Sequence, residues 1–132
     1  MTDIHDPNVQ RLLDAPNVAI ISTHNPDDSI LSAVVWQSVE DGQVAVNSAK
    51  GRQWPTNLER DPHITLVVVD PENPYSYVQV RGRASATTGG ADEHINQLSK
   101  KYIGQDEYPF RQPGEERVKF LIEPEKVTFV KQ

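Results

Sequence analysis

The tripeptide Lys50-Gly51-Arg52 has the residue types needed to bind a small anion. Lys50 and Arg52 can donate charge-assisted hydrogen bonds to a phosphate group, and a guanidinium can reach two oxygens at once. Gly51 allows the backbone to approach a ligand closely. Neutral donors flank the tripeptide at Asn47, Ser48 and Gln53. Because such tripeptides are common, an ordinary basic surface turn is the alternative interpretation of the local pattern.

Four aromatic side chains are candidates for contact with a ring-shaped ligand. Trp36 lies in an alternating, strand-like segment, so it fits the core or a subunit interface as well as a ligand contact. Trp54 follows the basic tripeptide, where it either covers a ring or packs a short helix against the rest of the protein. Tyr75 and Tyr77 are two residues apart and share one face of a strand, with packing at the rim as the alternative role.

Other catalytic chemistries find little support in the sequence. It contains no nucleophile elbow, no GxGxxG motif and no Walker loop. Cysteine is absent, which excludes disulfides, cysteine-bound zinc and thiol catalysis. The four histidines lack metal-ligand spacing, and the acidic pairs Asp27-Asp28 and Glu115-Glu116 are interpreted as solvated turns rather than acid–base pairs. The sequence therefore names no catalytic residue.

The composition predicts one folded domain over residues 1–132. Hydrophobic residues make up 36% and charged residues 24% of the chain, which is typical of a soluble globular protein. The net charge of −6 argues against nonspecific nucleic-acid binding, which depends on basic residues. No apolar run approaches the ~20 residues of a membrane helix, and the first residues do not have the pattern of a signal peptide. We therefore expect a cytoplasmic protein with no membrane or nucleic-acid partner.

The order of elements positions the basic tripeptide between two strands. Apolar or alternating runs predict six strands, at residues 18–23, 31–39, 44–46, 64–69, 75–86 and 118–122, with 127–130 continuing the last. Capping patterns predict two or three short helices, which begin at Pro7, at Pro55 and after Gly90. Because most connections have hairpin length, we expect an antiparallel six-stranded barrel of the α+β class, not a doubly wound parallel sheet.

Four segments together resemble a known superfamily. They read NVAIISTHNPDDSILSAVVW, VNSAKGRQWPTNLERDP, DPENPYSYVQVRGRA and HINQLSKKYIGQDEYPFRQPGEERV. They resemble the pyridoxamine 5′-phosphate oxidase-like split barrels, most of all the actinobacterial coenzyme F420-dependent flavin/deazaflavin oxidoreductases of the B group. The resemblance covers residues 7–130. It implies a Greek-key split β-barrel of the FMN-binding type, which forms a homodimer with cofactor sites at the subunit interface.

The resemblance also implies roles for individual residues. The strand from Ser32 through Val34 to Trp36 would line the tricyclic ring of the cofactor. Its phosphate would lie on Lys50, Arg52 and the neighbouring backbone, with Asn57 nearby. Tyr75 and Tyr77 would come from the other subunit to border the ring. These are the cofactor-binding residues that we expect, together with Asn47, Ser48, Gly51, Gln53 and Trp54.

The function implied by the resemblance is hydride transfer from reduced coenzyme F420 to a small electron-poor organic substrate, such as an enone, a quinone or a tetrapyrrole. Two alternatives stay open: an FMN-dependent oxidase or reductase, and a cofactor- or haem-binding module without catalysis. The sequence departs from many F420-binding relatives at Trp54, where they carry lysine, and at Thr56, where they carry a basic residue. This departure removes positive charge that would attract the polyanionic tail of F420, and it therefore keeps FMN in consideration.

Overall fold

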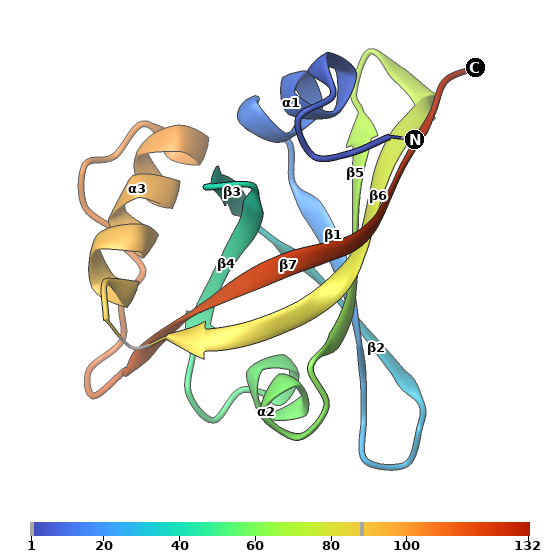
Figure 1. Ribbon diagram of the computed structural model, residues 1–132. Coiled ribbons are helices and arrows are strands. Elements are labelled where there is room, and N and C mark those ends of the chain that lie inside the picture. The colour runs from blue at the N-terminus through green and yellow to red at the C-terminus, as the bar shows by residue number, and fades with distance from the viewer. Residues whose placement is uncertain (1, 88) are drawn as a thin grey trace.

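The fold is a curled antiparallel sheet with three helices packed around it (Figure 1). It is known from a computed structural model that describes residues 2–87 and 89–132. The elements in chain order are α1 (Pro7–Asp14), β1 (Ala19–His24), β2 (Ile30–Val35), β3 (Gln37–Glu40), β4 (Gln43–Ala49), α2 (Gln53–Arg60), β5 (His63–Asp70), β6 (Asn73–Thr87), α3 (Ala91–Ile103) and β7 (Arg117–Val130).

The seven strands form one sheet in the order β2-β1-β5-β6-β7-β4-β3, and every neighbouring pair is antiparallel. The two strands at the ends of this order, β2 and β3, are consecutive in the chain and are separated by Trp36 alone. The chain therefore passes directly from one edge of the sheet to the other, which brings the two edges together as a barrel. This arrangement confirms the predicted antiparallel barrel.

The predicted single strand over residues 31–39 is wrong, and this is why the sheet has seven strands rather than six. The chain breaks at Trp36, and the backbone of the next residue, Gln37, is bonded by side chains of α3. Its N–H donates to Tyr102 Oη at 3.2 Å, and its carbonyl accepts from Lys101 Nζ at 2.8 Å. These two contacts come from far along the chain, so the local alternation of residues 31–39 did not reveal them.

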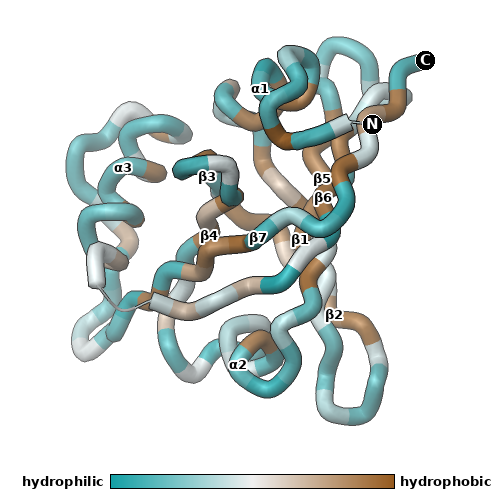
Figure 2. Tube along the Cα trace, viewed as in Figure 1, coloured by the Kyte–Doolittle hydropathy of each residue, from teal (hydrophilic) through white to brown (hydrophobic). Residues whose placement is uncertain are grey.

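The core lies inside the curl of the sheet. In β5, buried residues alternate with more exposed ones, as expected for a strand with one face on the core. In β4, by contrast, six consecutive residues are buried, because α3 packs beside the strand. Figure 2 shows the hydrophobic stretch of β4 and the mostly hydrophilic residues of α3.

The helix boundaries follow local capping signals at α1 and α3. Asp6 caps α1 by accepting a hydrogen bond from the Asn8 backbone at 2.9 Å, and Pro7 is the first residue of the helix. Gly90 and Gly104 flank α3, as predicted. The predicted start of α2 at Pro55 is wrong: α2 begins at Gln53. Proline fits within the first turn, where backbone N–H groups have no partner inside the helix.

The pairing of β6 is irregular at Gly82, where a bulge or bend was predicted. The pairing of β6 with β7 shifts register between Arg81 and Gly82, and Gly82 faces Pro124. A Cβ atom at Gly82 would lie 2.1 Å from the Glu123 carbonyl oxygen, so only glycine fits. Beyond Pro124 the strand continues, which confirms that residues 127–130 extend β7.

Within residues 2–87 and 89–132, no helix is both long enough and apolar enough to cross a membrane.

Candidate functional site

A small cavity of about 220 Å³ collects residues from most of the elements around β4. Its walls come from the end of β2, from β4, from the start of α2, from α3, from β7 and from the segment between α3 and β7. This last segment, residues 105–116, is here called the capping segment. The lining residues are Val34, Val35, Trp36, Asn47, Ser48, Arg52, Trp54, Ile95, Leu98, Tyr108, Phe110 and Arg117.

Aromatic rings form one side of the cavity. Trp36 stacks on Tyr102 of α3 with 5.3 Å between ring centroids and meets Tyr108 of the capping segment edge-on at 6.1 Å. Trp54 is buried and packs on Phe120 of β7 with 5.7 Å between centroids. Trp54 therefore both anchors α2 to the sheet and forms a wall of the cavity, so the two roles considered for it are compatible.

A buried polar network fixes the floor of the cavity, and Asn47 is at its centre. The Asn47 carbonyl oxygen Oδ1 accepts a hydrogen bond from Arg117 Nε at 3.0 Å. Its amide nitrogen Nδ2 donates to the Ala91 carbonyl oxygen at 2.9 Å and to His94 Nδ1 at 3.1 Å. Because Nδ1 of His94 accepts, its Nε2 carries the proton and donates to Ser38 Oγ at 2.9 Å. Asn47, which lines the cavity, is thus held in one orientation.

His94 is the neutral member of this network. Burial lowers its pKa to about 4, and the positive charges of Lys119 and Arg117 act in the same direction, while Glu40 opposes them. At neutral pH the ring therefore carries one proton and no charge. Both ring nitrogens are occupied by hydrogen bonds, which gives His94 a positioning role.

Arg117 and Glu115 form a buried ion pair beside the cavity. Their side chains are each 3% exposed, and the Arg117 guanidinium lies 5.1 Å from the centroid of the Tyr108 ring. Burial by itself raises the pKa of the Glu115 carboxyl. The hydrogen bond from Arg117, the backbone N–H of Gln112 and the charge of Arg52 outweigh burial and lower that pKa overall. The interpretation of Glu115 as a solvated turn residue is therefore wrong.

The two basic side chains of the tripeptide are already paired with acids. Lys50 Nζ is 3.2 Å from Glu116 Oε1, and Arg52 Nη2 is 3.8 Å from Glu115 Oε2. Gly51 has a φ of 92°, a conformation that favours glycine. Arg52 immediately precedes α2 and lines the cavity, whereas Lys50 does not line it.

Ser48 lines the cavity and has a buried hydroxyl without a partner among the described residues. The residue is 2% exposed, and its Oγ has no hydrogen-bond partner within the part of the chain that the structure describes. A buried hydroxyl without a partner costs free energy, so its position on a cavity wall indicates a place where a ligand supplies the missing hydrogen bond.

Other expected cofactor residues lie away from the cavity. Ser32 Oγ is 3.3 Å from Ser22 Oγ on the neighbouring strand. Asn57 is fully buried, and it donates to Thr23 Oγ1 and Asn25 Oδ1 while accepting from Gln53 Nε2, so its amide is fully used in joining α2 to β1.

Tyr75 and Tyr77 also lie outside the cavity. Both belong to the first part of β6, and Tyr75 is 71% exposed. Tyr77 is opposite Val69 of β5 and Val130 of β7 in the sheet. Within one chain, the structure thus unites Val34, Trp36, Asn47, Ser48, Arg52 and Trp54 at the cavity, but not Ser32, Lys50, Gly51, Gln53, Asn57, Tyr75 or Tyr77.

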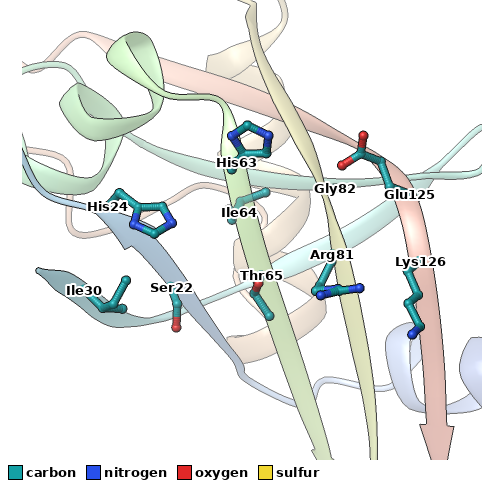
Figure 3. A pocket seen from close by; sticks show the side chains of 10 residues that line it. All are labelled: Ser22, His24, Ile30, His63, Ile64, Thr65, Arg81, Gly82, Glu125 and Lys126. Atoms are coloured by element: carbon teal, nitrogen blue, oxygen red, sulfur yellow. The ribbon is translucent and has the colours of Figure 1, made fainter. Parts of the chain in front are cut away.

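A larger groove of about 450 Å³ crosses the sheet (Figure 3). Its side chains come from five adjacent strands, from β2 to β7. Cationic and imidazole groups are prominent: His24, His63, Arg81 and Lys126 line it, with Glu125 as the acid. His63 is tied to its own surroundings, with Nδ1 2.7 Å from Asp61 Oδ1. The structure describes no group of three or more side chains suited to a metal ion in residues 2–87 and 89–132.

Arg117 is the main residue of the cavity that sequence reasoning missed. It directly precedes the apolar alternation of β7, so a charged residue at the start of a buried strand was the available signal. Its partners Asn47 and Tyr108 lie in other elements, and neither contact has a local signature in the sequence.

Known structures and one family share this architecture. A solved structure of an F420 reductase is 23% identical, with 90% of this chain and 94% of that chain covered and a TM-score of 0.79. The conserved hypothetical protein Rv2991 from Mycobacterium tuberculosis is 18% identical, with coverages of 98% and 84% and a TM-score of 0.76. A haem-binding protein from Mycobacterium smegmatis is 16% identical, with coverages of 91% and 51% and a TM-score of 0.70.

At these identities the likeness establishes the split-barrel fold. No curated protein matches the chain by sequence. The sequence profile of the pyridoxamine 5′-phosphate oxidase family, however, matches residues 5–131, which is nearly the whole chain. The chain therefore belongs to the pyridoxamine 5′-phosphate oxidase family.

Proposed function

We propose that this protein is an oxidoreductase that uses reduced coenzyme F420 to transfer a hydride to a small electron-poor organic substrate, of the enone, quinone or tetrapyrrole class. The observation that carries the proposal is the cavity beside β4. It combines aromatic walls at Trp36 and Trp54 with two arginines, Arg52 and Arg117, and with the unpaired hydroxyl of Ser48. Apolar walls with a few oriented polar groups are typical of cofactor sites.

The residues of the cavity fit a phosphate-bearing ring cofactor. Arg52 and the free N–H groups of the first turn of α2 would hold the phosphate. The Ser48 hydroxyl would bond a polar atom of the ligand, and Trp36 with Val34 would support the ring. When bound, F420 supplies the hydride, while these side chains orient the reactants and exclude water.

The size of the cavity supports a dimeric site. About 220 Å³ is less than the ~300–1,000 Å³ of common ligand sites, so a tricyclic ring must extend beyond it. The adjoining surface is the outer face of β2, where Val34 is 68% exposed and lies opposite the exposed Ile20 of β1. A second copy that covers this apolar surface would complete the site, and Tyr75 and Tyr77 would reach the ring from that copy.

The dimer has a direct test. Replacing Ile20 by lysine should convert a homodimer into a monomer in sedimentation experiments, because a charge would have to be buried in the interface. The same replacement at Ile103, exposed on α3 away from β2, is the matched control and should leave the dimer intact. A wild-type protein that sediments as a monomer would contradict the dimeric site.

FMN is the second candidate cofactor, and the charge around the basic tripeptide favours it. Lys50 and Arg52 each face a carboxylate, and Trp54 and Thr56 supply no further positive charge. Such a site suits one phosphate better than the long acidic tail of F420.

Two measurements separate these functions. Titration of F420, FMN and haem, followed through the fluorescence of Trp36 and Trp54, should give the tightest binding with F420. Tighter binding of FMN than of F420 would indicate a flavin enzyme instead. Oxidation of reduced F420 is then measured with enones, quinones and tetrapyrroles. Binding without turnover across this panel would identify a cofactor carrier instead.

A further inference from the structure

We infer that Glu115 and Glu116 compete with the ligand anion for Arg52 and Lys50, and thereby limit how much negative charge the site accepts. The inference rests on the proposed phosphate site and adds a specificity element to it. Both carboxylates stand at the end of the capping segment, directly before β7. Glu115 faces Arg52, which lines the cavity, and Glu116 faces Lys50, which lies outside the lining and two residues earlier in the chain.

The contact between Lys50 and Glu116 is the one that a ligand can displace. The two side chains are 41% and 66% exposed, and their charged atoms are 3.2 Å apart. Exposed ion pairs contribute little to stability because water and salt screen them. The backbones stay joined, however, since the Lys50 N–H donates to the Glu116 carbonyl oxygen at 2.9 Å. A displaced Glu116 side chain therefore remains close to the bound anion.

The Glu115 side chain, unlike the exposed Glu116 side chain, is held in place by buried contacts. Its carboxylate is 3% exposed and paired with Arg117, and one of its oxygens also accepts from the Gln112 N–H at 3.2 Å. Its distance to Arg52, 3.8 Å, is at the limit of an ion pair. A phosphate can therefore draw Arg52 away while Glu115 stays on Arg117 as a permanent negative charge beside the site.

The charge balance of this cluster predicts selectivity for short anions. Three cations, Lys50, Arg52 and Arg117, face two carboxylates, so the free cluster carries one net positive charge. One phosphate replaces Glu116 on Lys50 and gains attraction to both basic side chains. Each additional negative charge that a ligand places beside this cluster gains no further cation and is repelled by Glu115 and Glu116.

The test uses the full chain and inorganic anions of increasing charge. Dissociation constants for phosphate and tripolyphosphate are measured by competition with FMN and, independently, by thermal shift, for the wild type and Glu116→Gln. Glu116→Gln should bind phosphate roughly two- to fivefold more tightly, the range of one exposed ion pair, and should gain more for tripolyphosphate. Riboflavin, which lacks the phosphate, should bind both proteins equally.

Two controls isolate the Lys50 contact. Glu107→Gln removes an exposed carboxylate of the same capping segment that makes no ion pair within the described residues. This variant should leave both affinities unchanged. In a Lys50→Met background the gain from Glu116→Gln should disappear, as a double-mutant cycle requires for a direct competition.

The outcomes distinguish this inference from the proposed function. An unchanged phosphate affinity in Glu116→Gln overturns the inference, as does an equal gain in Glu107→Gln or the absence of phosphate binding to both proteins. If phosphate behaves as expected but neither F420 nor FMN binds, the proposed function fails and the competition stands.

Discussion

The small cavity beside β4 and the larger groove across the sheet differ in how their polar groups are held. The groove has about twice the volume, yet its cationic residues Arg81 and Lys126 are exposed and free to change rotamer. In the cavity, Arg117 is buried. It donates a hydrogen bond to Asn47, forms an ion pair with Glu115 and lies over the face of the Tyr108 ring. Volume alone would not select the cavity, because both the groove and a third pocket of about 720 Å³, between the N-terminal residues and β7, are larger.

The difference teaches that fixed polar groups, rather than hollow space, distinguish the proposed cofactor site. A buried polar network is stable only when its members are bonded to one another, and the Ser48 hydroxyl lies beside this network without a hydrogen-bond partner among the described residues. The network Ser38, His94, Asn47 and Arg117 has no counterpart among the residues that line the groove. Four substitutions test this contrast, each paired with its equivalent in the groove.

The largest expected effect is the loss of stability in Arg117→Met. The change leaves the Glu115 carboxylate buried without its partner and should lower the free energy of unfolding by about 3–5 kcal/mol. The equivalent Arg81→Met in the groove should change it by less than about 0.5 kcal/mol. Urea denaturation measures both. Equal losses of stability in Arg117→Met and Arg81→Met would remove the contrast. Partial recovery of stability in the double variant Arg117→Met/Glu115→Gln would support it.

The next effect is a dependence of stability on pH that comes from His94. Its pKa is about 4 in the folded protein and 6.5 in the reference state. Between these values the unfolded chain binds the proton and the folded protein does not, so stability should fall as the pH drops from 6.5 to 4. The shift corresponds to roughly 3 kcal/mol.

His94→Gln should remove this portion of the pH dependence, and His24→Gln, at the rim of the groove, should retain it. Thermal unfolding across pH 4–7 gives both profiles. Identical profiles for the two variants would show that His94 takes up its proton in the folded state as easily as in the unfolded chain.

Arg52→Ala should weaken binding of FMN without affecting riboflavin. The lost charge-assisted hydrogen bond to phosphate is worth ~1.5–3 kcal/mol, which is about tenfold or more in the dissociation constant. Arg81→Ala supplies the matched loss of one cation in the groove and should leave the affinity unchanged. If Arg81→Ala weakens FMN binding as much as Arg52→Ala does, the phosphate lies in the groove.

The smallest expected effect is that of Ser48→Ala, which should not lower the stability of the free protein but should weaken cofactor binding. Ser48→Ala removes a buried hydroxyl that has no partner, so the free protein should keep or gain stability, by up to about 1 kcal/mol. The cofactor should bind more weakly, because the ligand loses its hydrogen bond. Ser22→Ala in the groove should leave both quantities within about 0.5 kcal/mol of the wild type. A destabilised Ser48→Ala protein would mean that the hydroxyl already has a partner.

Local signals in the sequence were sufficient for the elements that depend on neighbouring residues. The start of α1 at Asp6 and Pro7, the ends of α3 and the bulge at Gly82 all follow from residue types at single positions. The family match agrees with the resemblance read from four segments. Four of the residues expected to bind the cofactor, Asn47, Ser48, Arg52 and Trp54, lie close together in the sequence and line the cavity, and their binding role stays a prediction.

Contacts between distant parts of the chain could not be predicted in this way. The break at Trp36 depends on Tyr102, which bonds a residue 65 positions away, and the orientation of Asn47 depends on Arg117, 70 positions away. Alternation in residues 31–39 describes only which face a side chain takes. It carries no information about the side chains that compete for the backbone of Gln37.

The passage of the chain through Trp36 also bears on aggregation. Since β2 and β3 are the two edges of one sheet, this single residue keeps together the strands whose unpaired backbone groups would otherwise attract another chain. Among the described residues, both edges already lack a partner in the sheet, and proteolytic cleavage at Trp36 would remove the covalent link that holds them near each other. The nicked protein would then be prone to edge-to-edge assembly into oligomers and fibrils.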